Sequence, residues 1–145
     1  MSRRENIAAD VITQLTAMSS PTLKKITREP FDVEELSDAQ FPALWISTGS
    51  ESREDTSCGG STAQRSGTID YVIIGYVKGT SLNVDTKRNE LITGVETTLD
   101  DDRTRNGYAS NTQVISVETD EGEAYPHGAI RLVVRIFYTF ERGTP

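Results

Sequence analysis

Apolar residues occupy alternate positions along two long stretches of the chain, which is the spacing of a β-strand. The stretch at residues 130–141 keeps this period throughout, and its intervening positions include Val133 and Phe137. Because apolar groups then lie on both faces, we expect a central strand of a sheet. Residues 68–78 show the same pattern, with Gly75 at a position that favours a bulge or a close approach of another segment.

Two other segments have apolar residues three and four positions apart, the spacing of an amphipathic helix. Residues 4–15 follow Ser2, and Glu5 completes with it the sequence of a capping box, so a helix is predicted to begin there. Residues 84–99 form the second predicted helix, with Asp85 as its N-cap. Its buried stripe is predicted to consist of Leu91, Ile92, Val95 and Leu99.

Shorter strands are predicted between these elements. Residues 22–28, 42–48 and 112–119 contain enough β-branched and other apolar residues for strands, and Trp45 is expected in the core. An acidic connection at residues 31–40 precedes the second of them. The last short strand and the final long strand together have the pattern of a long hairpin.

The segment at residues 49–66 lacks apolar periodicity and is rich in Ser, Thr and Gly with scattered charges. Such a long stretch without a predicted element is uncommon inside a compact domain and is usually functional or disordered. We therefore expect a flexible loop here, and we expect it to act as a contact arm. Because it contributes no expected core residue, removing residues 51–65 is predicted to leave the fold intact.

The order of these elements predicts one α+β domain over residues 1–145. The expected architecture is a mainly antiparallel, mixed sheet with two helices packed on it and one long extended loop at about residues 49–66. A chain of 145 residues is long enough to bury one sizeable core.

Charge and composition narrow the possible partners. The 22 acidic residues exceed the 15 basic ones and give a net charge of -7, which argues against duplex nucleic acid, since phosphate binding needs clustered Lys and Arg. No apolar run reaches the roughly 20 residues that a membrane helix needs, so no membrane partner is expected. The single cysteine, Cys58, cannot form a disulfide within the chain, which fits a reducing cytosol.

Residues that often carry catalysis are scarce. The only histidine, His127, falls in a Pro- and Gly-rich turn, and neither a zinc-type spacing nor a nucleotide-binding glycine motif occurs. Two acidic clusters, residues 100–102 and Asp120 with Glu121 and Glu123, have the oxygen ligands of a hard cation, but acids at loop positions are usually solvated surface. We expect no catalytic residue, no metal and no cofactor, and hence no enzyme.

Four arginines have positions that call for a role. The aspartates at residues 100–102 follow the second predicted helix, where the helix dipole disfavours negative charge, and Arg103 and Arg105 are the nearest residues to offset it. Arg131 and Arg135 share one face of the final strand with apolar residues. That face is either a mixed, half-exposed surface or a subunit interface.

Several segments occur in an order along the chain that is similar to the order in a known protein family. They are residues 4–15, residues 41–46, residues 88–91 leading into residues 95–99, and residues 117–123 before the closing strand. Together these segments resemble the tail terminator proteins of long-tailed bacteriophages, the lambda-like family. The likeness covers nearly the whole chain and contains no catalytic signature.

This resemblance implies a structural protein of the virion that forms a homo-oligomer, a hexameric ring, on the end of the tail tube distal from the tip. The ring would end tube polymerisation and form the head-tail joining interface, at the head-tail junction, after assembly in the host cytoplasm. The implied partners are the major tail tube protein and a head-completion or neck (connector) protein. DNA would pass through the ring without sequence-specific recognition.

Two groups of residues are expected to make these contacts. The expected tail-tube contact loop contains Glu51, Arg53, Glu54, Asp55 and Arg65. The expected inter-protomer contacts, against acids of a neighbour, come from Arg103, Arg105, Arg131 and Arg135.

Other interpretations stay open at this point. Another neck or tail-completion protein of the phage connector would have a similar fold. A small metal-dependent hydrolase would use the acids at residues 100–102 or 120–123, and it predicts metal binding that alanine substitution abolishes. A host-directed acidic binding protein would be present in infected cells and missing from purified particles.

Overall fold

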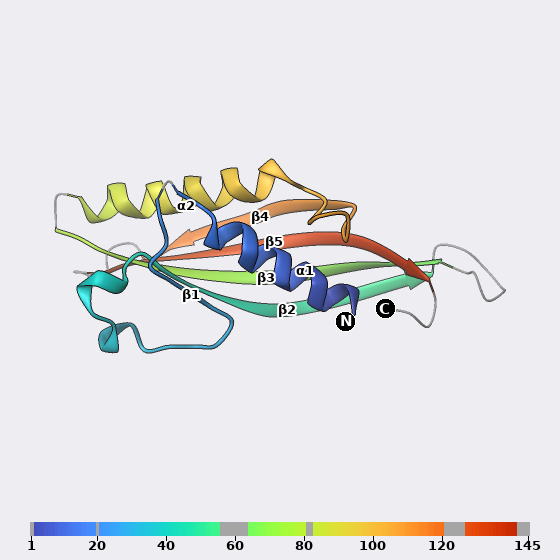
Figure 1. The fold of residues 1–145 in the computed structure, drawn as a ribbon, viewed down its shortest axis with the longest axis horizontal. Helices are drawn as coiled ribbons and strands as arrows, with labels where there is room; N and C mark the ends of the chain where they lie inside the picture. The colour runs from blue at the N-terminus through green and yellow to red at the C-terminus, as the bar shows by residue number, and fades with distance from the viewer. Residues whose placement is uncertain (1, 20, 56–63, 81–82, 121–126, 142–145) are drawn as a thin grey trace.

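The computed structural model describes residues 2–19, 21–55, 64–80, 83–120 and 127–141. It contains two α-helices and one five-stranded sheet with the strand order β1-β2-β3-β5-β4 (Figure 1). All neighbouring strands are antiparallel except β1 and β2, which are parallel. The elements are α1 (Arg3–Thr16), β1 (Lys25–Thr27), β2 (Ala43–Asp55), β3 (Gln64–Lys78), α2 (Val84–Asp101), β4 (Asn111–Thr119) and β5 (His127–Glu141). The α+β class and the mainly antiparallel, mixed sheet are thereby confirmed.

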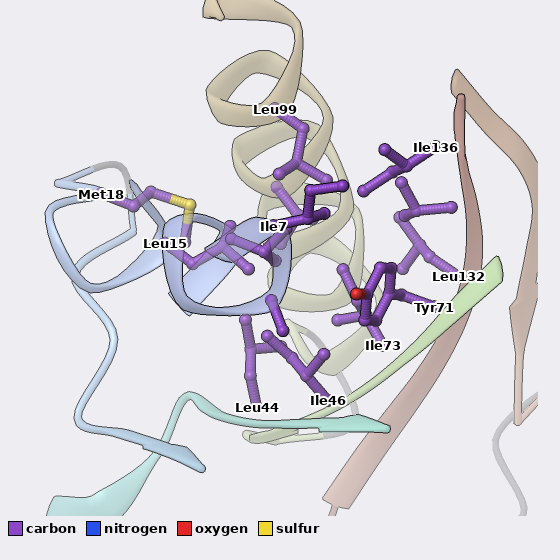
Figure 2. Close-up of a cluster of buried hydrophobic side chains, with 14 of the residues drawn as sticks. Ile7, Leu15, Met18, Leu44, Ile46, Tyr71, Ile73, Leu99, Leu132 and Ile136 are labelled. Carbon is purple, nitrogen blue, oxygen red and sulfur yellow. The ribbon is translucent and has the colours of Figure 1, made fainter. Parts of the chain in front are cut away.

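Both helices lie on one face of the sheet, so the protein has two layers with the core between them. Figure 2 shows side chains of α1 and α2 pointing toward those of β2, β3 and β5. Alternate residues of β3 and β5 supply much of this core, as the period of two predicts. Its fully buried members include Ile7, Leu15, Leu44, Ile69, Ile73, Leu91, Leu99, Leu132 and Ile136.

The two long strands also have the neighbours that the sequence predicts. β5 lies between β3 and β4, so it is not an edge strand. It pairs with β3 along the full length of both strands, from Gln64 opposite Glu141 to Lys78 opposite His127. β4 and β5 form the expected hairpin pairing.

The helix starts are only partly as predicted. Ser2 caps α1, because its Oγ accepts a hydrogen bond from the backbone N–H of Glu5 at 3.2 Å. The Glu5 carboxylate forms an ion pair with Arg28 at 2.5 Å, so the side chain that a capping box would use is engaged elsewhere. The N-cap of α2 is Asn83, and the prediction of Asp85 is wrong because that residue lies within the first turn.

The predicted loop at residues 49–66 is largely strand at its two ends. β2 continues to Asp55 and β3 begins at Gln64, with Asp55 paired opposite Arg65. The remainder, residues 56–63, lies outside the described residues. Backbone pairing with β5 extends this end of the sheet although its side chains lack a strand-like apolar period.

Trp45 does not belong to the buried core, and the prediction that it does is wrong. Its neighbours Leu44 and Ile46 are buried under the helices, so the alternation along β2 directs Trp45 to the opposite face, where it is half-buried. In α2, Ile92 is likewise half-buried, whereas Leu91, Val95 and Leu99 are fully buried as predicted.

The acidic connection at residues 31–40 contains two short 3-10 turns, Val33–Glu35 and Asp38–Gln40.

Within the described residues, neither helix is long and apolar enough to cross a membrane.

Gly75 lies where the core approaches the backbone of β3 most closely. A Cβ atom at this position would be 2.7 Å from Leu44 Cδ2 and 2.9 Å from both Ile130 Cγ1 and Leu91 Cδ2. These distances are shorter than ordinary van der Waals contacts, and the pairing with β2 is regular here. Of the two sequence alternatives, close approach is therefore the correct one.

We expect Gly75→Ala to lower the free energy of unfolding by about 1–3 kcal/mol, because three packed side chains must shift to admit the new methyl group. Urea denaturation followed by circular dichroism measures the change. Thr93→Ala, at an exposed position of α2, is the matched control and is expected to change the free energy by about 0.5 kcal/mol or less. Equal stability of the two variants would contradict the assignment.

Candidate functional site

The ends of β2, β3 and β5 form a projecting part of the sheet, which we call the distal arm and define as residues 51–55, 64–67 and 138–141. Figure 1 shows these strands continuing past the N-terminal end of α1. The expected tube-contact residues all lie on the distal arm, in strands β2 and β3. The register places Asp55 directly opposite Arg65 and Glu54 opposite Ser66.

Glu51 links β2 of the distal arm to α1 and to β5. Its carboxylate lies 3.2 Å from Arg4 Nε of α1 and 3.3 Å from Arg53 Nε, and it accepts a hydrogen bond from the Tyr138 hydroxyl. Only 14% of the Glu51 side chain is exposed. These internal contacts leave little of Glu51 for a partner, so its position favours a structural role over the expected direct contact.

The other expected contact residues differ in how far they face solvent. The guanidinium of Arg53 lies over the ring of Phe140, 5.0 Å from its centroid, and Phe140 in turn stacks with Tyr138. Arg65 is half-buried, whereas Glu54 is exposed. Among the residues of this set whose side chains the structure describes, Glu54 is therefore the one that the distal arm presents most directly to a partner, and the side chain of Asp55 lies outside that description.

The sheet surface away from the helices, which we call the open face, carries the second group of predicted residues. Its side chains alternate with those of the core along β2, β3 and β5. Seen across the strands, Trp45 neighbours Ile74 and Ile74 neighbours Arg131. The open face is formed by Trp45, Asp70, Val72, Ile74, Arg131, Val133, Arg135 and Phe137.

Ion pairs fix the two arginines of the open face. Arg135 donates two hydrogen bonds to Asp70, 2.9 Å long from Nε and 3.2 Å long from Nη2. Hydrogen bonding to Asp70 is the largest cause that raises the pKa of Arg135. Arg131 Nη1 is 3.6 Å from Glu118 of β4. Both guanidinium groups stay substantially exposed, at 41% for Arg135 and 46% for Arg131. The structure thus brings these two predicted residues onto one accessible surface.

Arg105 is not available to a neighbouring protomer, and this part of the interface prediction is wrong. Its side chain is fully buried, with Nη2 donating to the carbonyl oxygen of Leu99 at 2.5 Å and Nη1 at 3.5 Å from Asp10 Oδ2. Burial lowers the pKa of Arg105, while Asp10 opposes that change. The guanidinium instead caps the C-terminal end of α2, so the prediction that Arg105 offsets the helix dipole is confirmed.

Arg103 remains exposed on the other side of the same turn. Its Nε donates to the carbonyl oxygen of Thr112 at 3.1 Å, which ties the turn to β4. Arg105 and Asn106 have positive φ angles of 51° and 58°, followed by Gly107 at 87°, so the chain reverses sharply here. Asn and Gly tolerate this conformation.

The acids considered for metal binding have structural contacts. Asp102 accepts hydrogen bonds from Thr104 Oγ1 and from the backbone N–H groups of Thr104 and Asn106, and the Thr104 hydroxyl is the largest cause of its lowered pKa. Asp120 forms a 2.5 Å ion pair with Arg88, while Glu121 and Glu123 lie outside the described residues. Across residues 2–19, 21–55, 64–80, 83–120 and 127–141, no three His, Cys, Asp or Glu side chains gather to hold a metal ion.

His127 and Arg88 show what sequence reasoning missed. The His127 ring packs against Phe41 with the centroids 5.2 Å apart, so it is half-buried rather than a solvated turn residue. Arg88 is 7% exposed and joins Asp85 at 2.7 Å to Asp120 at 2.5 Å. The only local signal for that cluster is the three-residue spacing of Asp85 and Arg88.

No protein-family model matches the sequence, and no curated protein matches it. Among solved structures, the chain is similar to one from "Virion of native gene transfer agent (GTA) particle", with 12% identity, a TM-score of 0.40, and coverage of 96% of this chain and 92% of that chain. A likeness of this extent does not identify a family or an activity.

Replacing the buried guanidinium by Arg105→Met is expected to lower the free energy of unfolding by roughly 3–5 kcal/mol, because it leaves the Asp10 carboxylate buried without its ion pair and the Leu99 carbonyl without its donor. Chemical denaturation measures the loss. The matched control is Arg131→Ala, on the exposed side of β5, with an expected change of about 1 kcal/mol or less. A similar loss in both variants would argue against the capping role.

Two tyrosines are expected to ionise late. Burial is the largest cause that raises the pKa of Tyr71 and of Tyr138 to about 12 each, with the Glu51 hydrogen bond contributing at Tyr138. A tyrosine of the unfolded chain ionises near pH 10, so the two raised pKa values stabilise the folded state while both hydroxyls stay protonated. This contribution to stability is complete below about pH 10 and falls as the pH rises toward about 12. Absorbance titration of tyrosinate should show two late groups in the native protein and one in Tyr138→Phe. A single transition for all tyrosines near pH 10 would contradict the burial.

Proposed function

We propose that this chain is a phage-like structural protein that acts as a tail terminator, assembling as a hexameric ring on the end of the tail tube distal from the tip. In this role it ends tube polymerisation and offers the surface that the head joins, through a head-completion or neck protein. The proposed location is the head-tail junction of the virion.

The observation that carries this proposal is the open face, a partly apolar sheet surface that neither helix covers. Val72, Ile74 and Val133 are half-buried there although the core lies on the opposite side of their strands. Antiparallel sheets that face water on one side usually carry polar residues on that side. Apolar residues in these positions support an assembly role, because an interface would remove them from water.

The distal arm supports the second half of the proposal, contact with the major tail tube protein. It projects beyond α1, and the Glu51 contacts with α1 and β5 hold it in one orientation. A rigid projection binds with a smaller loss of conformational entropy than a loop that must order first. Glu54 and Arg53 give it charges of both signs, which suits a specific polar contact.

We propose no catalytic activity for the protein. The acids that a metal-dependent hydrolase would use include Asp102 and Asp120, which here cap a turn and neutralise a buried arginine. Removing either group would therefore act first on stability.

Light scattering across concentration, followed by negative-stain imaging with purified tail tubes, tests the proposal. We expect either a six-fold ring in solution or a monomer that becomes a ring at one end of each tube. The protein should also be found by mass spectrometry in purified particles. A monomer that does not bind tubes and is missing from particles would overturn the proposed function.

The distal arm makes a more specific prediction. Glu54→Lys is expected to reduce occupancy of tube ends by roughly tenfold or more at a fixed protein concentration, because it reverses an exposed charge at the proposed contact. Ring formation and the unfolding midpoint should stay unchanged. Glu29→Lys, an exposed acid in the connection after β1, is the matched control. Equal tube binding by the two variants would contradict the arm assignment.

Deleting residues 51–65 is not a suitable version of this experiment. The deletion would remove Glu51 from Arg4 and Tyr138, and it would remove the part of β2 that pairs with β3 beside Ile69. Contrary to the sequence prediction, we therefore expect this deletion to disturb the fold, because the segment makes structural contacts without contributing apolar side chains.

A further inference from the structure

We infer that the open face of one protomer packs against the outer surface of α2 of the next copy, in a head-to-tail contact that repeats around the ring. This inference rests on the proposed function, since it specifies which two surfaces join the copies. The open face is thus covered by a second copy of this chain, which contacts it through a different surface, the outer side of α2.

The chemistry of the open face fits a protein surface. Trp45, Val72, Ile74, Val133 and Phe137 are half-buried and belong to β2, β3 and β5, so they form one apolar area across adjacent strands. The indole Nε1 of Trp45 is buried and makes no hydrogen bond among the described residues. Such an area loses contact with water when another layer covers it.

The size of the open face suits the centre of an interface. Three strands at a spacing of about 4.8 Å, followed for about 7 residues of β5, give a surface of roughly 23 Å by 14 Å, or about 330 Å². A specific protein interface buries about 800 Å² on each partner. The open face would therefore form the apolar centre of a ring contact that extends onto the surface around it.

The symmetry of a ring excludes the open face of the neighbour as the occupant. Two identical faces packed on each other form a closed two-fold dimer, whereas a ring needs two different surfaces on each protomer. Two like faces would also bring the same arginines together. The occupant must then be a different surface of the neighbour, such as an edge strand or the helix layer.

The edges of the sheet are poor candidates for that contact. The register of β4 against β5 shifts between Val114 and Ser116, and the register of β2 against β3 shifts between Thr48 and Glu51. Each irregularity lies on a strand at or near the free edge of the sheet. Such bulges twist the strand and interrupt regular pairing with another chain. Of these two candidates, the helix layer is therefore favoured.

Charge complementarity identifies α2 as the part of that layer that fits. The open face carries the guanidinium groups of Arg131 and Arg135, whose side chains stay 46% and 41% exposed beside their ion-pair partners Glu118 and Asp70. The outer surface of α2 is acidic, because Lys87 is the only exposed base among several exposed or half-exposed acids. These acids are Asp85, Glu90, Glu96, Asp100 and Asp101.

A hollow of about 240 Å³ at one side of the open face offers a place for an inserted side chain. Ile74 and Ala129 form apolar parts of its lining, and Arg131 and Glu118 form charged parts. A helix side chain that ends in a carboxylate would place its methylene groups on the apolar part and its charge beside Arg131. The incoming carboxylate would give Arg131 a second ion pair, in addition to its 3.6 Å contact with Glu118.

Cysteine cross-linking tests which surfaces meet. In a Cys58→Ser background, Val133→Cys marks the open face and Thr93→Cys marks the exposed surface of α2. With a short bismaleimide added to rings, in solution or on tube ends, the variant carrying both cysteines should give a ladder of cross-linked species. Each variant with one cysteine should remain uncross-linked, and circular dichroism confirms that all three are folded.

The other outcomes separate this inference from the proposed function. Cross-linked dimers from Val133→Cys alone would overturn the inference in favour of two open faces in contact. Rings that give no ladder would also overturn it, while leaving the terminator role in place. A protein that forms no ring and does not bind tubes would overturn both.

A charge-reversal series gives an independent measurement. Arg131→Glu is expected to weaken assembly by roughly tenfold in the concentration at half-association, measured by light scattering. Combining it with Glu90→Lys and Asp100→Lys should restore much of the lost assembly, because the two surfaces again have opposite charges. A purely structural role of Arg131 predicts no such rescue, so its absence with a normal unfolding midpoint would contradict the contact.

Discussion

The pairing of β3 with β5 is the constraint on which the rest of the structure depends. These strands are bonded along their full length and carry alternating buried residues on one side, which α1 and α2 cover. Two helices suffice for one face of the sheet only. The apolar residues at the intervening positions are therefore left without a covering layer, and the open face follows directly from the composition of these two strands.

Charged residues inside the protein hold the helix layer in place at both ends of α2. Arg88 near its start joins Asp85 and Asp120, while Arg105 after its end contacts the Leu99 carbonyl and Asp10 of α1. Buried charges are costly unless they are paired, so these contacts restrict how α2 can lie on the sheet. A fixed α2 matters for the proposed ring, because its outer surface must meet the next protomer in a constant orientation.

The proposed contacts are distributed so that they do not compete. The distal arm lies at one end of the strands and is attached through Glu51 to α1 and β5, whereas the open face extends across the middle of the sheet. A tube contact at the arm and a copy-to-copy contact on the open face can then form at the same time. The acidic net charge of -7 is concentrated partly on α2, where the proposal uses it.

The sequence by itself determined the element order, both helices and the alternating faces of β3 and β5, because these depend on short-range periodicity and on local capping at Ser2. It also indicated Arg103 and Arg105 as the residues nearest to offset the end of α2. Only the tertiary structure decided that Arg105 is buried, that Glu51 holds the distal arm, and that Trp45 lies on the open face. Those outcomes depend on partners far away in the sequence, such as Asp10 and Tyr138, and on strand pairing that the polar residues at 49–55 do not signal. Local patterns carry no information about such contacts, since backbone hydrogen bonds and long-range ion pairs form without a periodic arrangement of side chains.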